Sequence, residues 1–291
     1  MLKALIKLIE DNYIMQNSIP MIVEKLRDLD TELQSKDPSD KCKLLNECLQ
    51  NIDSHFHINY DPEKVSQIKL DEASMPSEEV FEKLAYDSWK QSNFGFQSVQ
   101  ILEGNIGYIN LTEFVKPKFS KETTSATIQF VQHTNALIFD LCRNGGGSPD
   151  MVQLLISHLV SAEPQHLITF HHRSSNTHHE SWTLSEIGGV RLPDMPVYVL
   201  TSSRTASAAE EFAYDLKHMR RATIIGETTC GAAHPVDLLT FEDAYLVAMP
   251  TGQPIHAVTG ENWEKKGVTP HIHISAEQSL SEALRTITVE R

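Results

Sequence analysis

A serine at the junction of two periodic segments is the first candidate for chemistry. Residues 199–217 read VLTSSRTASAAEEFAYDLK. The apolar run ending in small hydroxylated residues predicts a buried strand, and the Ala, Glu, Phe and Leu that follow at helical spacing predict a helix. Ser207 would then lie at a helix N-terminus, where free backbone N–H groups stabilise the oxyanion formed when a hydroxyl attacks a carbonyl. The alternative is that Ser207 only caps the helix, as serine often does.

A glycine-rich loop is the second candidate. RNGGG, from Arg143 to Gly147, follows the apolar run ALIFDL and precedes MVQLLISHLV, a predicted helix. Adjacent glycines let the backbone approach a ligand closely and turn its N–H groups inward, as in an oxyanion hole or a phosphate loop. A tight turn with positive φ explains them equally well. The dinucleotide G-x-G-x-x-G and the P-loop G-K-[ST] are both absent from the sequence.

Acyl transfer also needs a base and a group that orients it. The candidate bases are His55 and His57 near one end of the chain, with Ser54 and Asp53 beside them, and Lys217 and Lys265 beyond Ser207. The candidate carboxylates are Glu210, Glu227 and Glu264. Spacing alone does not choose among these residues, because the members of a triad meet only in the fold.

The histidines invite a metal interpretation, which the pattern disfavours. His171, His172, His178 and His179 cluster in a polar predicted hairpin, and no H-E-x-x-H occurs. Neighbouring residues of a strand point to opposite faces, so His171 and His172 cannot readily share a metal. We therefore expect neither a metal nor a cofactor.

Composition narrows the class of protein. The 291 residues are 40% hydrophobic and 22% charged, with a net charge of −14. This charge argues against a nucleic-acid partner, and no apolar run reaches membrane-spanning length, so no membrane partner is expected. Residues 1–14 lack a secretory pattern, and Cys42, Cys48, Cys142 and Cys230 form neither a disulfide framework nor a CxxC site. A cytoplasmic location is the default expectation, although a secreted chain without its leader would look the same, and the sequence allows a homo-oligomer.

The elements that must position these residues fall into three segments. Residues 1–60 predict two or three amphipathic helices, followed by a strand over 55–60 that ends a small helical domain. Residues 61–93 are polar and predict a linker or lid, with a short helix over 78–91. From residue 94 strands and helices alternate, beginning with a hairpin around Glu103-Gly104-Asn105, which predicts an α/β domain over 94–291.

Several of these motifs occur in an order typical of a known family. The series NIGYINL, ALIFDLCRNGGGSPDM, PVYVLTSSRTASAAEEFAYDLK, RATIIGETTCGAAHP and NWEKKGVTP resembles the tail-specific (C-terminal processing) serine peptidase superfamily. It looks closest to the branch of interphotoreceptor retinoid-binding protein modules and tricorn-like peptidases, over roughly residues 1–275. The resemblance implies a crotonase-like core of repeated β-β-α units.

The resemblance also implies roles for individual residues. Ser207 corresponds to the nucleophile, and the backbone N–H groups of Ala208 and Gly146 to the oxyanion hole. The lysine of the Ser–Lys branch is missing, because Ala232 and Ala233 stand in its place. Ser54-His55 instead resembles the Ser-His pair of the tricorn-like branch, and Glu264 resembles the glutamate of its Ser–His–Ser–Glu tetrad. His57 is the alternative base.

The function expected from these features is that of a serine peptidase. Residues 61–93 are too few for the PDZ domain that tail-processing relatives usually carry, so the expected substrates are short or unfolded peptides. The alternative is a non-catalytic module that binds a hydrophobic ligand such as a retinoid or fatty acid. Fold analogy with the retinoid-binding branch is the only support for that alternative.

Overall fold

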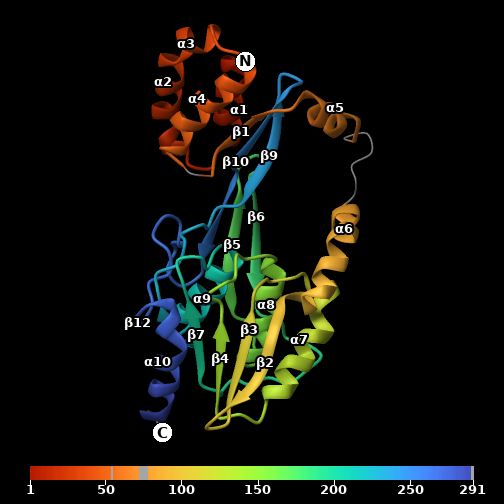
Figure 1. Ribbon diagram of the computed structural model, residues 1–291, viewed down its shortest axis with the longest axis vertical. Coiled ribbons are helices and arrows are strands. Elements are labelled where there is room, and N and C mark those ends of the chain that lie inside the picture. Colours follow the sequence, from red (N-terminus) through yellow and green to blue (C-terminus); the bar gives the residue numbers. More distant parts are fainter. Residues whose placement is uncertain (54, 72–77, 290–291) are drawn as a thin grey trace. The chain divides into compact units, whose positions relative to one another are not determined.

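A computed structural model describes residues 1–53, 55–71 and 78–289 (Figure 1). The chain forms two compact units. Unit 1 contains residues 1–82, 170–178 and 234–253, and unit 2 contains residues 83–169, 179–233 and 254–291. This division differs from the contiguous ranges 1–60, 61–93 and 94–291 that the sequence suggests, because two later segments pack with the N-terminal residues.

Unit 1 begins with four α-helices, α1 (Leu2–Asn12), α2 (Ile19–Asp28), α3 (Asp30–Gln34) and α4 (Pro38–Gln50). The amphipathic pattern of residues 19–33 predicts one helix, but the helix is divided at Leu29, whose N–H bonds to the Leu26 carbonyl in a tighter turn. α4 starts three residues before the helix expected from residue 41, because the Asp37 side chain caps it by accepting the Asp40 N–H at 3.0 Å and Pro38 occupies its first turn.

The helices of unit 1 pack against a three-stranded antiparallel sheet, β1 (His57–Tyr60), β10 (Tyr245–Pro250) and β9 (Val236–Phe241), in the order β1-β10-β9. Of the strand predicted over 55–60, residues 57–60 form β1, and the side chains alternate, since Phe56 and Ile58 are buried while His57 and Asn59 are exposed. β9 was not predicted: Asp237 interrupts its apolar pattern, and in the structure that carboxylate accepts the Thr251 hydroxyl at 2.6 Å.

The tip of a hairpin completes unit 1. β5 (His166–His172) and β6 (Thr177–Trp182) flank it, and β11 (Gly252–His256) pairs with β5. The Arg173 guanidinium at the tip donates to the carbonyls of Tyr13 and Glu10 at the end of α1. The His171 ring stacks on His178, with centroids 4.5 Å apart.

Unit 2 is built on a six-stranded sheet in the order β12-β8-β7-β4-β3-β2. Its strands are β2 (Phe96–Leu102), β3 (Ile106–Leu111), β4 (Ala136–Asp140), β7 (Val197–Thr201), β8 (Thr223–Gly226) and β12 (Ile272–His273). β2 and β3 form the predicted antiparallel hairpin, and the other neighbours pair in parallel. The α/β expectation is therefore confirmed.

Helices cover both faces of this sheet (Figure 1). α10 (Ala276–Val289) packs on one face, where Ile138, Leu200 and Ile225 meet Ala283. α7 (Pro117–Val131), α8 (Pro149–Leu159) and α9 (Ala208–His218) belong to the other, where Phe212 of α9 packs on Phe139 of β4. Because β4 and β7 are parallel, the loops leading to α8 and α9 leave the same, carboxyl-terminal edge of the sheet.

The segment expected to be a polar linker contains two helices, α5 (Pro62–Asp71) and α6 (Glu78–Gln91). Asp61 accepts the Lys64 N–H at 2.9 Å, so an N-cap and Pro62 start α5 despite its polar composition. Within the described ranges, no helix has the length and apolar character needed to cross a membrane.

Candidate active site

Ser207 occupies a strained position at the start of α9. It is the N-cap residue, with φ 54° and ψ −125°, values that a residue with a side chain rarely adopts. Ser207 itself is exposed, whereas the residues of α9 that follow it, Ala208 to Leu216, are buried. A strained backbone with an exposed serine at the start of a helix is a feature that catalytic nucleophiles share.

Glu210, one turn into α9, stabilises this position. Its Oε2 accepts the Ser207 N–H and the Ala232 N–H, both at 2.9 Å. Its Oε1 accepts the Thr229 hydroxyl at 2.5 Å and the Gly231 N–H at 2.6 Å. Burial raises the pKa of Glu210, and the four hydrogen bonds oppose that rise by favouring the carboxylate. One buried side chain thus joins the Ser207 backbone to the loop after β8.

Gly146 lies directly against Ser207. Its φ is +113°, and a Cβ built on it would come 2.7 Å from the Ser207 Cβ, 3.0 Å from the Ala206 carbonyl oxygen and 3.1 Å from the Ala208 nitrogen. A glycine is therefore required here, because any side chain would fill the space beside Ser207 Cβ and the Ala208 N–H. The structure brings together three of the predicted residues, Ser207, Gly146 and Ala208.

The Gly146 N–H is engaged within its own loop. It donates to Asn144 Oδ1 at 2.9 Å, while Asn144 Nδ2 donates to the Leu111 carbonyl at 2.9 Å. The Asn144 carbonyl also accepts the Ala206 N–H. Asn144 is fully buried and so ties the glycine loop to β3 and to the residues before Ser207. In this conformation the bare Cα of Gly146 is what keeps space open at the Ala208 N–H.

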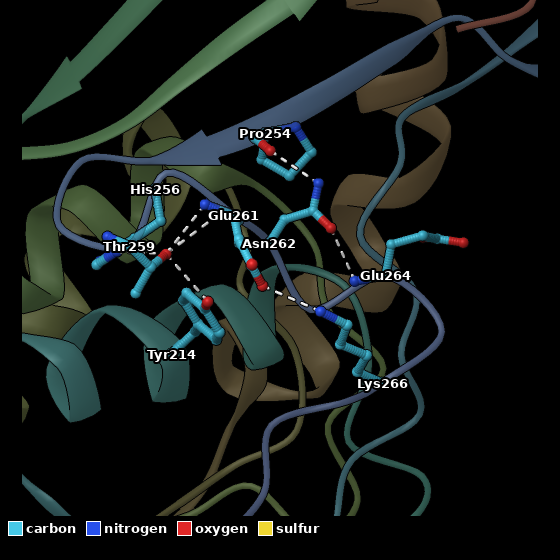
Figure 2. Close-up of polar contacts among 8 residues, drawn as sticks. All are labelled: Tyr214, Pro254, His256, Thr259, Glu261, Asn262, Glu264 and Lys266. Atoms are coloured by element: carbon cyan, nitrogen blue, oxygen red, sulfur yellow. Dashed lines mark hydrogen bonds and ion pairs between the residues drawn. The ribbon is translucent and has the colours of Figure 1, made fainter. Parts of the chain in front are cut away.

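Glu264 is held in a loop that is well fixed by polar contacts (Figure 2). Asn262 Nδ2 donates to the Pro254 carbonyl and its Oδ1 accepts the Glu264 N–H, both at 2.9 Å. Glu264 Oε2 accepts the Ala233 N–H at 2.9 Å. Glu264 therefore contacts the stretch where the Ser–Lys branch would carry its lysine.

His55 belongs to unit 1 and has a carboxylate partner there. Its Nδ1 lies 2.8 Å from Asp53 Oδ1, and Asp53 Oδ2 accepts the Tyr13 hydroxyl at 2.8 Å. Burial opposes ionisation of Asp53, but the hydrogen bonds from His55 and Tyr13 outweigh it and lower the pKa of this carboxyl to about 2. An ionised carboxylate only accepts hydrogen bonds, so the neutral His55 ring carries its proton on Nδ1 and has Nε2 as its basic nitrogen.

Other histidines of unit 1 lie close by. The His234 ring centroid is 6.5 Å from that of His55, and His234 is buried. His57, the alternative base, is exposed in β1 opposite Ala248. The predicted Ser54 lies outside the described residues.

Several residues at the site were not assigned a role from the sequence. Asp53 was named only as a neighbour of His55, and Glu210 only as one of several carboxylates. Asp53 stands two residues before His55, and Glu210 three after Ser207 at a capping position, so local spacing carried a signal in both cases. Asn144 and Tyr13 form hydrogen bonds with residues distant in the chain, and no local sequence pattern indicates such bonds.

Comparison with known proteins shows similarity to peptidases. Residues 105–274, more than half of the chain, match the sequence pattern of peptidase family S41. A carboxyl-terminal-processing protease of Synechocystis sp. (strain ATCC 27184 / PCC 6803 / Kazusa) is 32% identical over 146 residues, 50% of this chain and 32% of that protein. A carboxy-terminal-processing protease of Bartonella bacilliformis (strain ATCC 35685 / KC583 / Herrer 020/F12,63) is 27% identical over 186 residues, 62% of this chain and 41% of that protein. The matches thus span less than half of these relatives.

Solved structures share the fold over nearly the whole chain. A protein from Parabacteroides merdae ATCC 43184 has a TM-score of 0.69 at 17% identity, covering 98% of this chain and 95% of that one. A lipoprotein from Streptococcus agalactiae has a TM-score of 0.60 at 17% identity, covering 98% and 94%.

Proposed function

Because the chain belongs to peptidase family S41, we propose that it is a serine peptidase that cleaves short or unfolded peptides. The observation that carries the proposal is the position of Ser207, exposed at the start of α9 with its backbone N–H bonded to Glu210 and the bare Cα of Gly146 beside it. A helix cap needs neither the strained φ nor the close approach of a glycine.

In the proposed reaction the Ser207 hydroxyl attacks the peptide carbonyl. His55 takes the hydroxyl proton on Nε2 and later gives it to the leaving amine. Asp53 holds the proton of the ring on Nδ1 and stabilises the imidazolium that forms. The Ala208 N–H stabilises the oxyanion, with the Gly146 N–H joining it if that group is released from Asn144. The orienting roles of Ser54 and Glu264 stay predictions from the family resemblance.

A fluorophosphonate probe tests the proposal without a known substrate, because it labels only serines that are activated as nucleophiles. We expect wild-type protein to be labelled, Ser207→Ala to lose labelling, and His55→Ala to lose most of it. Ser203→Ala is a matched control, because Ser203 is an exposed serine of the same loop.

Two results would contradict the proposal. One is the absence of labelling in folded wild-type protein, which would favour the hydrophobic-ligand module and lead to analysis of a lipid extract. The other is labelling that persists in Ser207→Ala. If labelling behaves as expected, a peptide library would then define the substrate.

A further inference from the structure

A hollow in unit 2 lies away from Ser207. It has a volume of about 350 Å³ and is lined by the ends of three elements: Pro196, Val197 and Tyr198 at the start of β7, Lys217, Arg220 and Arg221 at the end of α9, and Ala222 and Thr223 leading into β8, with His271 beside them. This volume equals roughly twelve water molecules at about 30 Å³ each, which is enough for a small polyatomic ligand.

The hollow lies at the amino-terminal edge of the parallel strands. Ser207 follows the carboxyl end of β7, whereas Val197 begins it. The five residues of β7 rise about 16 Å, and the eleven residues of α9 are about as long. A ligand in this hollow would therefore be too far from Ser207 to be the reacting part of a substrate.

Cationic groups dominate the hollow. Lys217, Arg220 and Arg221 each contribute a positive charge, and among the described residues that line it there is no Asp or Glu. Asp194 acts on Arg221 from outside this lining. In a chain with 39 acidic and 25 basic side chains, three cations gathered without a lining carboxylate form an unusual local excess of positive charge.

The side chains are partly fixed by contacts that leave donors for a ligand. Lys217 Nζ donates to the Thr269 carbonyl at 2.5 Å, which uses one of its three N–H bonds. Arg221 donates from Nε to the Leu159 carbonyl at 2.5 Å and from Nη2 to the Leu192 carbonyl at 2.7 Å, which fixes the guanidinium in place. Arg220 is exposed and lies at the rim.

His271 adds a neutral donor. Its Nδ1 accepts the Ile224 N–H at 2.9 Å, so the neutral ring carries its proton on Nε2. Burial and the neighbouring Lys217 lower the pKa of His271, which keeps the ring neutral near pH 7. Cations at the carboxyl end of α9 also interact favourably with the helix dipole. The dipole accounts for a cation at position 217. It does not account for the hollow that β7, β8 and His271 form around these charges.

We propose that this hollow binds a phosphate group, carried by inorganic phosphate or a small phosphate monoester. Arginine and lysine are the usual partners of phosphate oxygens, and three cations suit a dianion better than a single carboxylate. Because the site includes the last turn of α9, whose N-cap residue is Ser207, a bound phosphate would stabilise the helix that Ser207 begins. The site does not depend on the proposed peptidase activity.

Isothermal titration of the full chain with inorganic phosphate and, separately, with methyl phosphate tests the proposal at constant ionic strength. We expect saturable binding in wild-type protein. We expect binding at least about tenfold weaker in Lys217→Gln and in Arg220→Gln, since each removes one charge-assisted contact. Binding of both ligands indicates a phosphomonoester site, and binding of inorganic phosphate alone indicates an inorganic phosphate site.

Lys90→Gln is the control, because it removes the same charge from an exposed position on α6. It should bind phosphate like the wild type. The proposal is overturned if phosphate gives no saturable binding up to about 10 mM, if Lys90→Gln weakens binding as much as Arg220→Gln, or if acetate binds as well as phosphate. Arg220 is exposed, so its variant should fold normally, which circular dichroism verifies.

Discussion

Replacing Gly146 by alanine tests the geometry beside Ser207 most directly. The new methyl group would come 2.7 Å from the Ser207 Cβ and 3.1 Å from the Ala208 nitrogen. Contacts this short force the glycine loop or Ser207 to move. Movement of either displaces the hydroxyl, the Ala208 N–H or both.

Gly146→Ala is expected to lower both the stability of the protein and its rate of labelling. A residue with a side chain at φ +113° costs about 1–3 kcal/mol of stability. Loss of one oxyanion donor lowers the rate by about 10²–10³-fold. We therefore expect Gly146→Ala to unfold at lower urea concentration and to react with a fluorophosphonate probe at least about 100-fold more slowly than wild type, in protein shown to be folded.

The neighbouring glycine provides the control. A Cβ on Gly145 meets nothing within 4 Å, and its φ lies outside the positive range that side chains avoid. Gly145→Ala should label at the wild-type rate and keep its stability within about 0.5 kcal/mol. Labelling of Gly146→Ala at nearly the wild-type rate would refute the reasoning, and so would an equal loss in Gly145→Ala.

Two further substitutions test groups that the structure places in unusual environments. Asp53→Asn should slow labelling by about 10⁴-fold, because an amide no longer holds the His55 proton on Nδ1. The control Asp28→Asn changes an exposed residue of unit 1 and should not slow labelling. Labelling of Asp53→Asn at the wild-type rate would exclude Asp53 as the orienting group. Glu211→Gln concerns the buried pair Glu211 and Asp215 of α9, where burial raises both pKa values well above the ordinary range. The folded state then holds protons that the unfolded state releases above about pH 4, so the free energy of unfolding falls as pH rises, by up to about 1.4 kcal/mol per pH unit for each group. Urea unfolding at several pH values should show that the free energy of unfolding falls less steeply with pH in Glu211→Gln than in wild type. In the exposed control Glu122→Gln it should fall as in wild type. Equal slopes in all three proteins would contradict the prediction.

The sequence was sufficient for elements with a strong local pattern. The strand, turn and helix around Ser207 and the hairpin of β2 and β3 lie where periodicity and turn residues predict them. α5 was missed because a capping Asp61 and Pro62 start a helix whose composition is polar. β9 was missed because Asp237 interrupts its apolar pattern. Pairing with β10 and the hydrogen bond from Thr251 to Asp237 stabilise the strand all the same.

The candidate site divides in the same way. The sequence by itself indicated Ser207, the glycine loop and a histidine near residue 55, because the residue types that nucleophilic chemistry requires stand at recognisable junctions. Only the tertiary structure showed that Asp53 bonds to both His55 and Tyr13, that Glu210 bonds to the loop after β8, and that Gly146 lies against Ser207. In most of these contacts the partners are far apart in the chain, and a hydrogen bond or a steric contact depends on positions in space, which residue spacing does not specify.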